Sequence, residues 1–81
     1  MDRTEILSRL TIIFRNVFDD DLIVAHDRMT ASEVSSWDSL SNIRMIVAVE
    51  EALKLQFTTT EISDLANVGA LVDVIYSKVN A

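Results

Sequence analysis

The sequence contains no cysteine and no proline, and it has a single glycine and a single histidine. The lack of cysteine excludes disulfide bonds and thiolate metal sites, and a lone histidine disfavours a zinc site. So few helix breakers favour long helices over a loop-rich β fold. No apolar run approaches the roughly 18 residues of a membrane span, and no basic segment precedes an apolar block at the start. We therefore expect a cytoplasmic protein without a membrane-spanning segment or a signal peptide.

The chain is 81 residues long, which suits one domain and is too short for two. Thirteen Asp and Glu residues stand against seven Lys and Arg residues, which gives a formal net charge of −6. Such acidity disfavours binding to nucleic-acid phosphates and favours partners with basic surfaces. We expect a single domain over residues 1–81 that is soluble, monomeric and does not bind nucleic acid.

Helical periodicity predicts an all-α fold, a small four-helix bundle with three longer helices, one short third helix and a long loop between helices one and two. The first helix is expected over about 4–18, and the second from Asp38 or a few residues earlier to 53 or 54. The third is expected from 59 or 60 to 65, and the fourth after its cap Asn67. Ser35 and Asp38 both suit the start of the second helix, so its first residue stays open. The inward stripes of the first and last helices are Ile6, Leu7, Leu10, Ile13, Phe14, Val17 and Phe18, and Val68, Leu71, Val72, Ile75 and Val79.

Residues 19–36 show no helical period, and a loop of this length in a small domain is usually functional. Its acidic start, Asp19-Asp20-Asp21, is expected to end the first helix, because carboxylates are unfavourable at the negative end of a helix dipole. This run lacks the alternating ligands and the glycine of a calcium-binding loop. Five apolar residues are candidates to hold the loop against the core: Leu22, Ile23, Val24, Met29 and Val34. Trp37 is expected to pack at the edge of the core.

The predicted second helix is apolar on nearly all sides, but its charges share one arc at about 100° per residue. That arc is expected to face water, and the opposite arc to face the core. The core arc holds Asn42, Met45, Ile46, Val49, Ala52 and Leu53. The water-facing arc holds Leu40, Ile43, Arg44, Val47, Glu50, Glu51 and Lys54. Its three aliphatic residues are then covered by the 19–36 loop, or are scattered surface apolar residues without a special role, or form an exposed ridge that docks another protein.

Ser39 lies at or near the N-terminus of this helix, where free N–H groups and the helix dipole favour a phosphate. Serine is also common at such positions, so geometry alone favours no special role. Together, His26, Asp38 and Ser39 supply the residue types of a hydrolytic triad. The Gly-x-Ser-x-Gly turn is absent, however, and the chain is short for building a pocket. We therefore assign no catalytic residue and no metal site, and we expect that the chain is not an enzyme.

The segment Trp37-Asp38-Ser39-Leu40, which opens an apolar helix ending in Glu50-Glu51, resembles the acyl carrier protein family. In that family, Asp-Ser-Leu marks the serine that receives a 4′-phosphopantetheine arm. Residues 57–62 and 68–75 are similar to the entry of the family's short third helix and to its last helix. The resemblance covers essentially the whole chain. Three departures stand out: Trp37 occupies a place where many members have glycine, Ser41 and Arg44 occupy places on the second helix where acids are frequent, and Ala70 follows Gly69 where an acid is frequent.

The resemblance implies a carrier of acyl intermediates, held as thioesters on phosphopantetheine attached to Ser39, with Asp38 and Leu40 completing the attachment motif. It implies fatty-acid, polyketide or related secondary-metabolite biosynthesis as the setting. The implied partners are a phosphopantetheinyl transferase and acyl-loading, acyl-transfer and condensing enzymes. These would dock on Leu40, Ile43, Arg44, Val47, Glu50 and Glu51. An aminoacyl or peptidyl carrier of a non-ribosomal peptide-type pathway and an unmodified helical interaction module stay open as alternatives.

Overall fold

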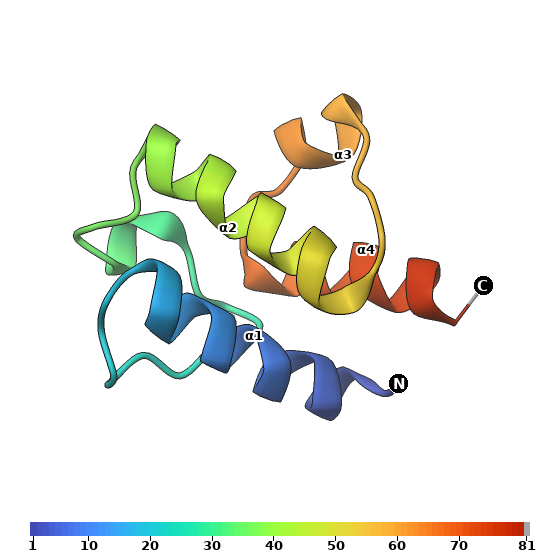
Figure 1. The fold of residues 1–81 in the computed structure, drawn as a ribbon, viewed down its shortest axis with the longest axis horizontal. Helices are drawn as coiled ribbons and strands as arrows, with labels where there is room; N and C mark the ends of the chain where they lie inside the picture. Colours follow the sequence, from blue (N-terminus) through green and yellow to red (C-terminus); the bar gives the residue numbers. More distant parts are fainter. Residues whose placement is uncertain (81) are drawn as a thin grey trace.

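The computed structural model describes residues 1–80 and contains four α-helices and one 3₁₀ turn (Figure 1). The helices are α1 (Arg3–Val17), α2 (Ser39–Leu53), α3 (Thr59–Ser63) and α4 (Val68–Val79), and the turn η1 covers Ala31–Glu33. Helix α1 contacts both α2 and α4, while the short α3 lies above α2 in this view. No strand occurs in the described part of the chain. The predicted all-α bundle with a short third helix is therefore confirmed.

Side-chain caps set the start of each α-helix. Asp2, Asp38 and Asn67 each accept a hydrogen bond of 2.8–2.9 Å from the backbone N–H three residues later. Thr58 and Glu61 form the reciprocal capping box that their spacing predicts. The first residue of the second helix, which the sequence left open, is thus settled by the carboxylate of Asp38.

Helix α1 ends just before the acidic run, where the backbone takes a specific turn. Asp19 adopts a left-handed conformation with φ of 51°, and the Asp20 backbone N–H donates to the Arg15 carbonyl oxygen at 3.1 Å. This pattern satisfies the carbonyl groups that the last turn leaves free. Helix α3 also ends earlier than expected, at Ser63 instead of Leu65, because the chain must turn there to enter α4.

The core is one apolar cluster formed by the inward faces of α1, α2 and α4. Phe14, Val49 and Leu71, one from each of these helices, expose 1% or less of their surface. Their common burial confirms the predicted stripes. Ala52 is an exception, because it was expected on the core face of α2 and is exposed. It lines an open hollow between α1 and α2, where Ile12 is also exposed.

The loop 19–36 folds against the bundle instead of covering the outer face of α2. Three of its predicted anchors are buried: Ile23, Met29 and Val34. Leu22 and Val24 are exposed by 89% and 60%, so their expected anchoring roles are wrong. Successive side chains alternate between the two sides of this segment, and Ala25, which the pattern did not single out, is buried beside Ile23.

Polar contacts attach the same loop to α1. The Thr11 hydroxyl oxygen accepts a hydrogen bond from the Ala25 backbone N–H at 2.9 Å. The Arg15 guanidinium donates to the Ile23 carbonyl oxygen at 2.8 Å. These bonds satisfy backbone groups that would otherwise be left unpaired beside the core.

The first turn of α4 approaches the loop closely. The backbone N–H groups of Val68 and Gly69 donate to the carbonyl oxygens of Met29 and Asp27, both at 2.8 Å. A Cβ atom on Gly69 would lie only 2.8 Å from the Asp27 carbonyl oxygen. Glycine is required here for this close approach, and not for an unusual backbone angle.

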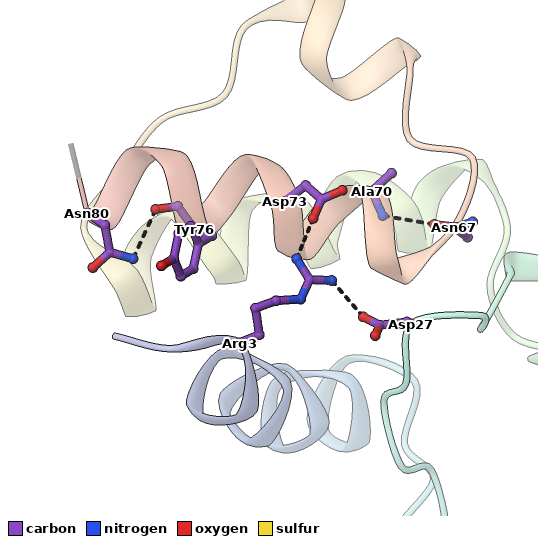
Figure 2. Close-up of polar contacts among 7 residues, drawn as sticks. All are labelled: Arg3, Asp27, Asn67, Ala70, Asp73, Tyr76 and Asn80. Carbon is purple, nitrogen blue, oxygen red and sulfur yellow. Dashed lines mark hydrogen bonds and ion pairs between the residues drawn. The ribbon is translucent and has the colours of Figure 1, made fainter.

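Arg3 ties α1 to the loop and to α4 (Figure 2). Its guanidinium pairs with Asp73, and with Asp27 at 2.9 Å, and these hydrogen bonds raise the pKa of Arg3 above its ordinary value. The Met1 amino group also donates to the Asn80 side-chain oxygen at 3.1 Å, so the two ends of the described chain meet. Within residues 1–80, no helix is both long enough and apolar enough to cross a membrane.

Candidate functional site

Ser39 is the first residue of α2, and its side chain is exposed. The neighbouring Asp38 carboxylate accepts the Ser41 backbone N–H at 2.9 Å. This hydrogen bond lowers the pKa of Asp38, because it stabilises the ionised form. Across residues 1–80, no side-chain hydrogen bond engages the Ser39 hydroxyl. Asp38 thus serves the helix, and the hydroxyl beside it is left open to a reaction partner.

An open hollow of about 370 Å³ adjoins Ser39, and its other lining residues are Ala31, Trp37, Asp38 and Asn42. The Trp37 ring packs with its centroid 4.9 Å from that of Phe18, and its Nε1–H donates to Asn42 Oδ1 at 3.0 Å. The expected packing role of Trp37 is confirmed. The indole therefore forms a fixed wall beside the serine.

The outer face of α2 carries an exposed aliphatic ridge. Leu40, Ile43 and Val47 are exposed by 67%, 60% and 45%. Of the interpretations of these residues, coverage by the 19–36 loop is wrong, because that loop packs on α1 and α4. Arg44 and Glu51 are exposed beside the ridge, so apolar and charged side chains share this face.

Glu50 differs from its neighbours on the predicted water-facing arc. It is half-buried, and its Oε2 accepts the Phe57 backbone N–H at 2.9 Å. This contact holds the segment that leads from α2 to α3. The carboxylate of Glu50 therefore has a structural task, which distinguishes it from the exposed Glu51.

The chain matches no family model, and no curated protein matches it significantly. Among solved structures, it is similar to the solution NMR structure of a holo acyl carrier protein from Geobacter metallireducens. The two are 43% identical, the similarity covers 91% of this chain and 85% of the other, and the TM-score is 0.87. The chain belongs to the acyl carrier protein family. The resemblance inferred from the Asp-Ser-Leu motif and the helix pattern is thus confirmed.

His26, Asp38 and Ser39, the three residue types of a hydrolytic triad, are not linked to one another by side-chain hydrogen bonds among the described residues. His26 Nε2 lies 3.8 Å from Glu33 Oε1, and no hydrogen bond joins it to Ser39 among the described residues. Asp38 is occupied by its own helix. No cluster of His, Asp and Glu in residues 1–80 has the arrangement of a metal site.

The sequence did not predict one part of this acyl carrier protein surface, a groove between α1 and α2. Asn16 and Val17 of α1 face the outer side of α2 across an open groove of about 410 Å³. Ile43, Arg44 and Val47 line its other wall, with Ala48 and Glu51 completing it. Periodicity describes each helix separately, so it gives no signal for a surface that two helices share.

Proposed function

We propose that the chain carries acyl intermediates as thioesters on a 4′-phosphopantetheine arm attached to Ser39. The observation that carries this proposal is the exposed Ser39 hydroxyl in an Asp-Ser-Leu motif at the first residue of α2. The holo state of the Geobacter relative supports a covalently attached group in this chain as well. The pathway is fatty-acid, polyketide or related secondary-metabolite biosynthesis.

The surroundings of Ser39 suit a phosphodiester. The free N–H groups and positive dipole end of α2 favour its negative charge, and the adjoining hollow leaves room for the arm. In the attachment reaction, the Ser39 oxygen forms a bond to the phosphorus that bears the pantetheine in coenzyme A. The bond from that phosphorus to the adenosine bisphosphate breaks, and the serine proton passes to a base of the transferase, which also supplies magnesium. Once attached, the arm supplies the thiol that this cysteine-free chain lacks.

In this function, the chain is a substrate of enzymes and not a catalyst. It presents Ser39 and its cargo while the exposed ridge of Leu40, Ile43 and Val47, with Arg44, Glu50 and Glu51 beside it, contacts the transferase and the acyl-loading and condensing enzymes. A carrier must pass between enzymes, so small and transient contacts suit it. We expect the protein to act as a cytoplasmic monomer.

One observation favours a second candidate cargo. Arg44 is exposed near Ser39, and the first turn of α2 contains no acid. The enzymes that serve a fatty-acid carrier are expected to bind it through basic patches. This face of α2 is poorly suited to such enzymes. An aminoacyl or peptidyl cargo in a non-ribosomal peptide-type pathway is therefore the alternative. Offering the modified protein to acyl-transfer and amino-acid-activating enzymes separates the two, because only the matching enzyme loads it.

The proposal is tested by intact mass after incubation with coenzyme A, Mg²⁺ and a phosphopantetheinyl transferase. The parent is expected to gain one phosphopantetheinyl group, and Ser39→Ala to gain none. Ser35→Ala is the matched control, because Ser35 is also an exposed serine just before α2 and should leave the gain intact. A gain that survives in Ser39→Ala would refute the assignment, and a parent without any gain would favour an unmodified interaction module.

A further inference from the structure

The outer face of α2 has two flanks that differ in their neighbours. One flank borders α1 across the groove lined by Asn16 and Val17. The other borders the segment leading to α3, where Glu50 binds the Phe57 backbone. An enzyme that acts on Ser39 can therefore cover the ridge from either side, and the charges on the two flanks distinguish these approaches.

Two acids on the α3 side, Glu61 and Glu50, are engaged within the molecule. Glu61 Oε1 lies 2.9 Å from Lys78 Nζ, and the same carboxylate oxygen accepts the Thr58 backbone N–H at 2.8 Å. These contacts lower the pKa of Glu61, with the Thr58 hydrogen bond as the largest cause. Glu50 is engaged as well, through Phe57. The exposed Asp64, at the far end of α3, is the acid that remains open on this side.

The charges on the α1 side are open. Arg44 and Glu51 are both exposed, and neither forms an ion pair within residues 1–80. They lie seven residues apart on one stripe of α2, which corresponds to roughly 10 Å along the axis. Val47 lies between them along the helix and Ile43 lies one residue before Arg44, and both line the groove with the half-buried Val17. This surface offers an apolar trough with a cation at the end nearer Ser39 and an anion at the other.

We infer that the phosphopantetheinyl transferase covers this α1–α2 groove and places a carboxylate against Arg44. The inference rests on the proposed modification of Ser39. Arg44 follows Ser39 by five residues, roughly 7 Å along the helix axis, so one enzyme can contact both. A basic patch at this place would face the Arg44 guanidinium and be repelled, whereas a carboxylate would pair with it. An apolar side chain of the transferase then fills the trough between Val17 and Val47.

The kinetic test measures kcat/KM for phosphopantetheine transfer, with the Ser39 mass gain as the readout. Arg44→Glu is expected to lower kcat/KM by about tenfold, and Arg44→Lys to stay within about threefold of the parent, because the positive charge is kept. Asp64→Lys is the matched control. It reverses an exposed charge on the α3 side and should leave the rate within about twofold. Circular dichroism and melting of each variant establish that it is folded.

The spectroscopic test locates the contact by following backbone amide signals of the ¹⁵N-labelled Ser39→Ala protein as transferase is added. Signals of Asn16 and Val17 are expected to shift or broaden, and those of Ser63 and Asp64 to stay in place. Perturbation confined to the α3 side, or Arg44→Glu modified at the parent rate, would overturn the groove assignment while leaving the proposed function intact. A parent protein that gains no mass at Ser39 would overturn both.

Discussion

The two faces of α2 are built from similar aliphatic residues, but one face is buried and the other is exposed. On the inner face, Met45, Ile46 and Val49 expose 5% or less of their surface. On the outer face, Leu40 and Val47 are exposed by 67% and 45%. Residue type therefore does not decide which side of this helix is buried. The difference follows from the charges, because Arg44 and Glu51 share the outer arc and burying them would cost more than exposing a few methyl groups.

The largest effect is expected on the inner side of this comparison, from Phe14→Ala. Phe14 is fully buried against the inner face of α2, and its ring also packs on Phe18 and Trp37. Truncating a buried Phe costs about 3–5 kcal/mol, which is a large part of the stability of a small domain. Urea denaturation should show a protein that is unfolded or nearly so. A midpoint equal to that of the parent would show that the inner face is not the core.

A smaller loss is expected from Gly69→Ala, which tests how the loop is held against the core. The added Cβ would lie 2.8 Å from the Asp27 carbonyl oxygen, and a backbone atom cannot simply rotate away. Forcing this contact apart should cost about 1–3 kcal/mol, more than the better helix propensity of alanine returns. Thermal melting measures the loss. A variant that is more stable than the parent would contradict the close approach of α4 to the loop.

Acidification tests the caps that position α2 and α3. The pKa values of Asp38 and Glu61 are lowered from their ordinary 3.8 and 4.5 in the folded protein. Their ionised forms therefore stabilise the fold above about pH 4.5, and this contribution is lost as the pH falls through the folded pKa values. Melting temperature should fall progressively below pH 4.5. Asp38→Asn keeps a capping oxygen but does not titrate, so its melting temperature should depend less steeply on pH; an equal slope would contradict the role of Asp38.

The smallest effect is expected on the outer face, from Leu40→Ser. Leu40 is exposed by 67%, so its replacement should change the free energy of unfolding by no more than about 0.5 kcal/mol. Denaturant titration of the variant beside the parent measures this difference. A loss of more than about 1 kcal/mol would show that the ridge is packed in solution, and the contrast between the two faces would disappear.

Much of the fold was predictable from local patterns. The cap Asn67 and the inward stripes of the long helices depend on residues close together in the sequence, and each was found. The exposed ridge followed from the same angular argument. Ser39 was singled out by its motif and helix position, although periodicity alone favoured no role for it.

The remaining features depend on contacts between distant segments. Apolar character alone suggested that Leu22 and Val24 anchor the loop, but the path of the loop across α1 decides which of its side chains face inward. The helix pattern predicted that Glu50 is a surface charge. In the structure, the chain after α2 folds back and places the Phe57 N–H against the Glu50 carboxylate. The groove that includes Asn16 requires two helices at once. A sequence pattern within one helix contains no information on such partners.

The most direct measurement is a matched pair of substitutions, Val47→Asp and Val49→Asp, compared for both melting temperature and rate of modification by the transferase. The two residues lie two positions apart on α2, and one is 45% exposed while the other is fully buried. The account predicts that Val49→Asp unfolds the protein, whereas Val47→Asp melts within a few degrees of the parent and is modified several-fold more slowly. It would be contradicted if Val47→Asp unfolded the protein, or if that variant stayed folded and was modified at the parent rate.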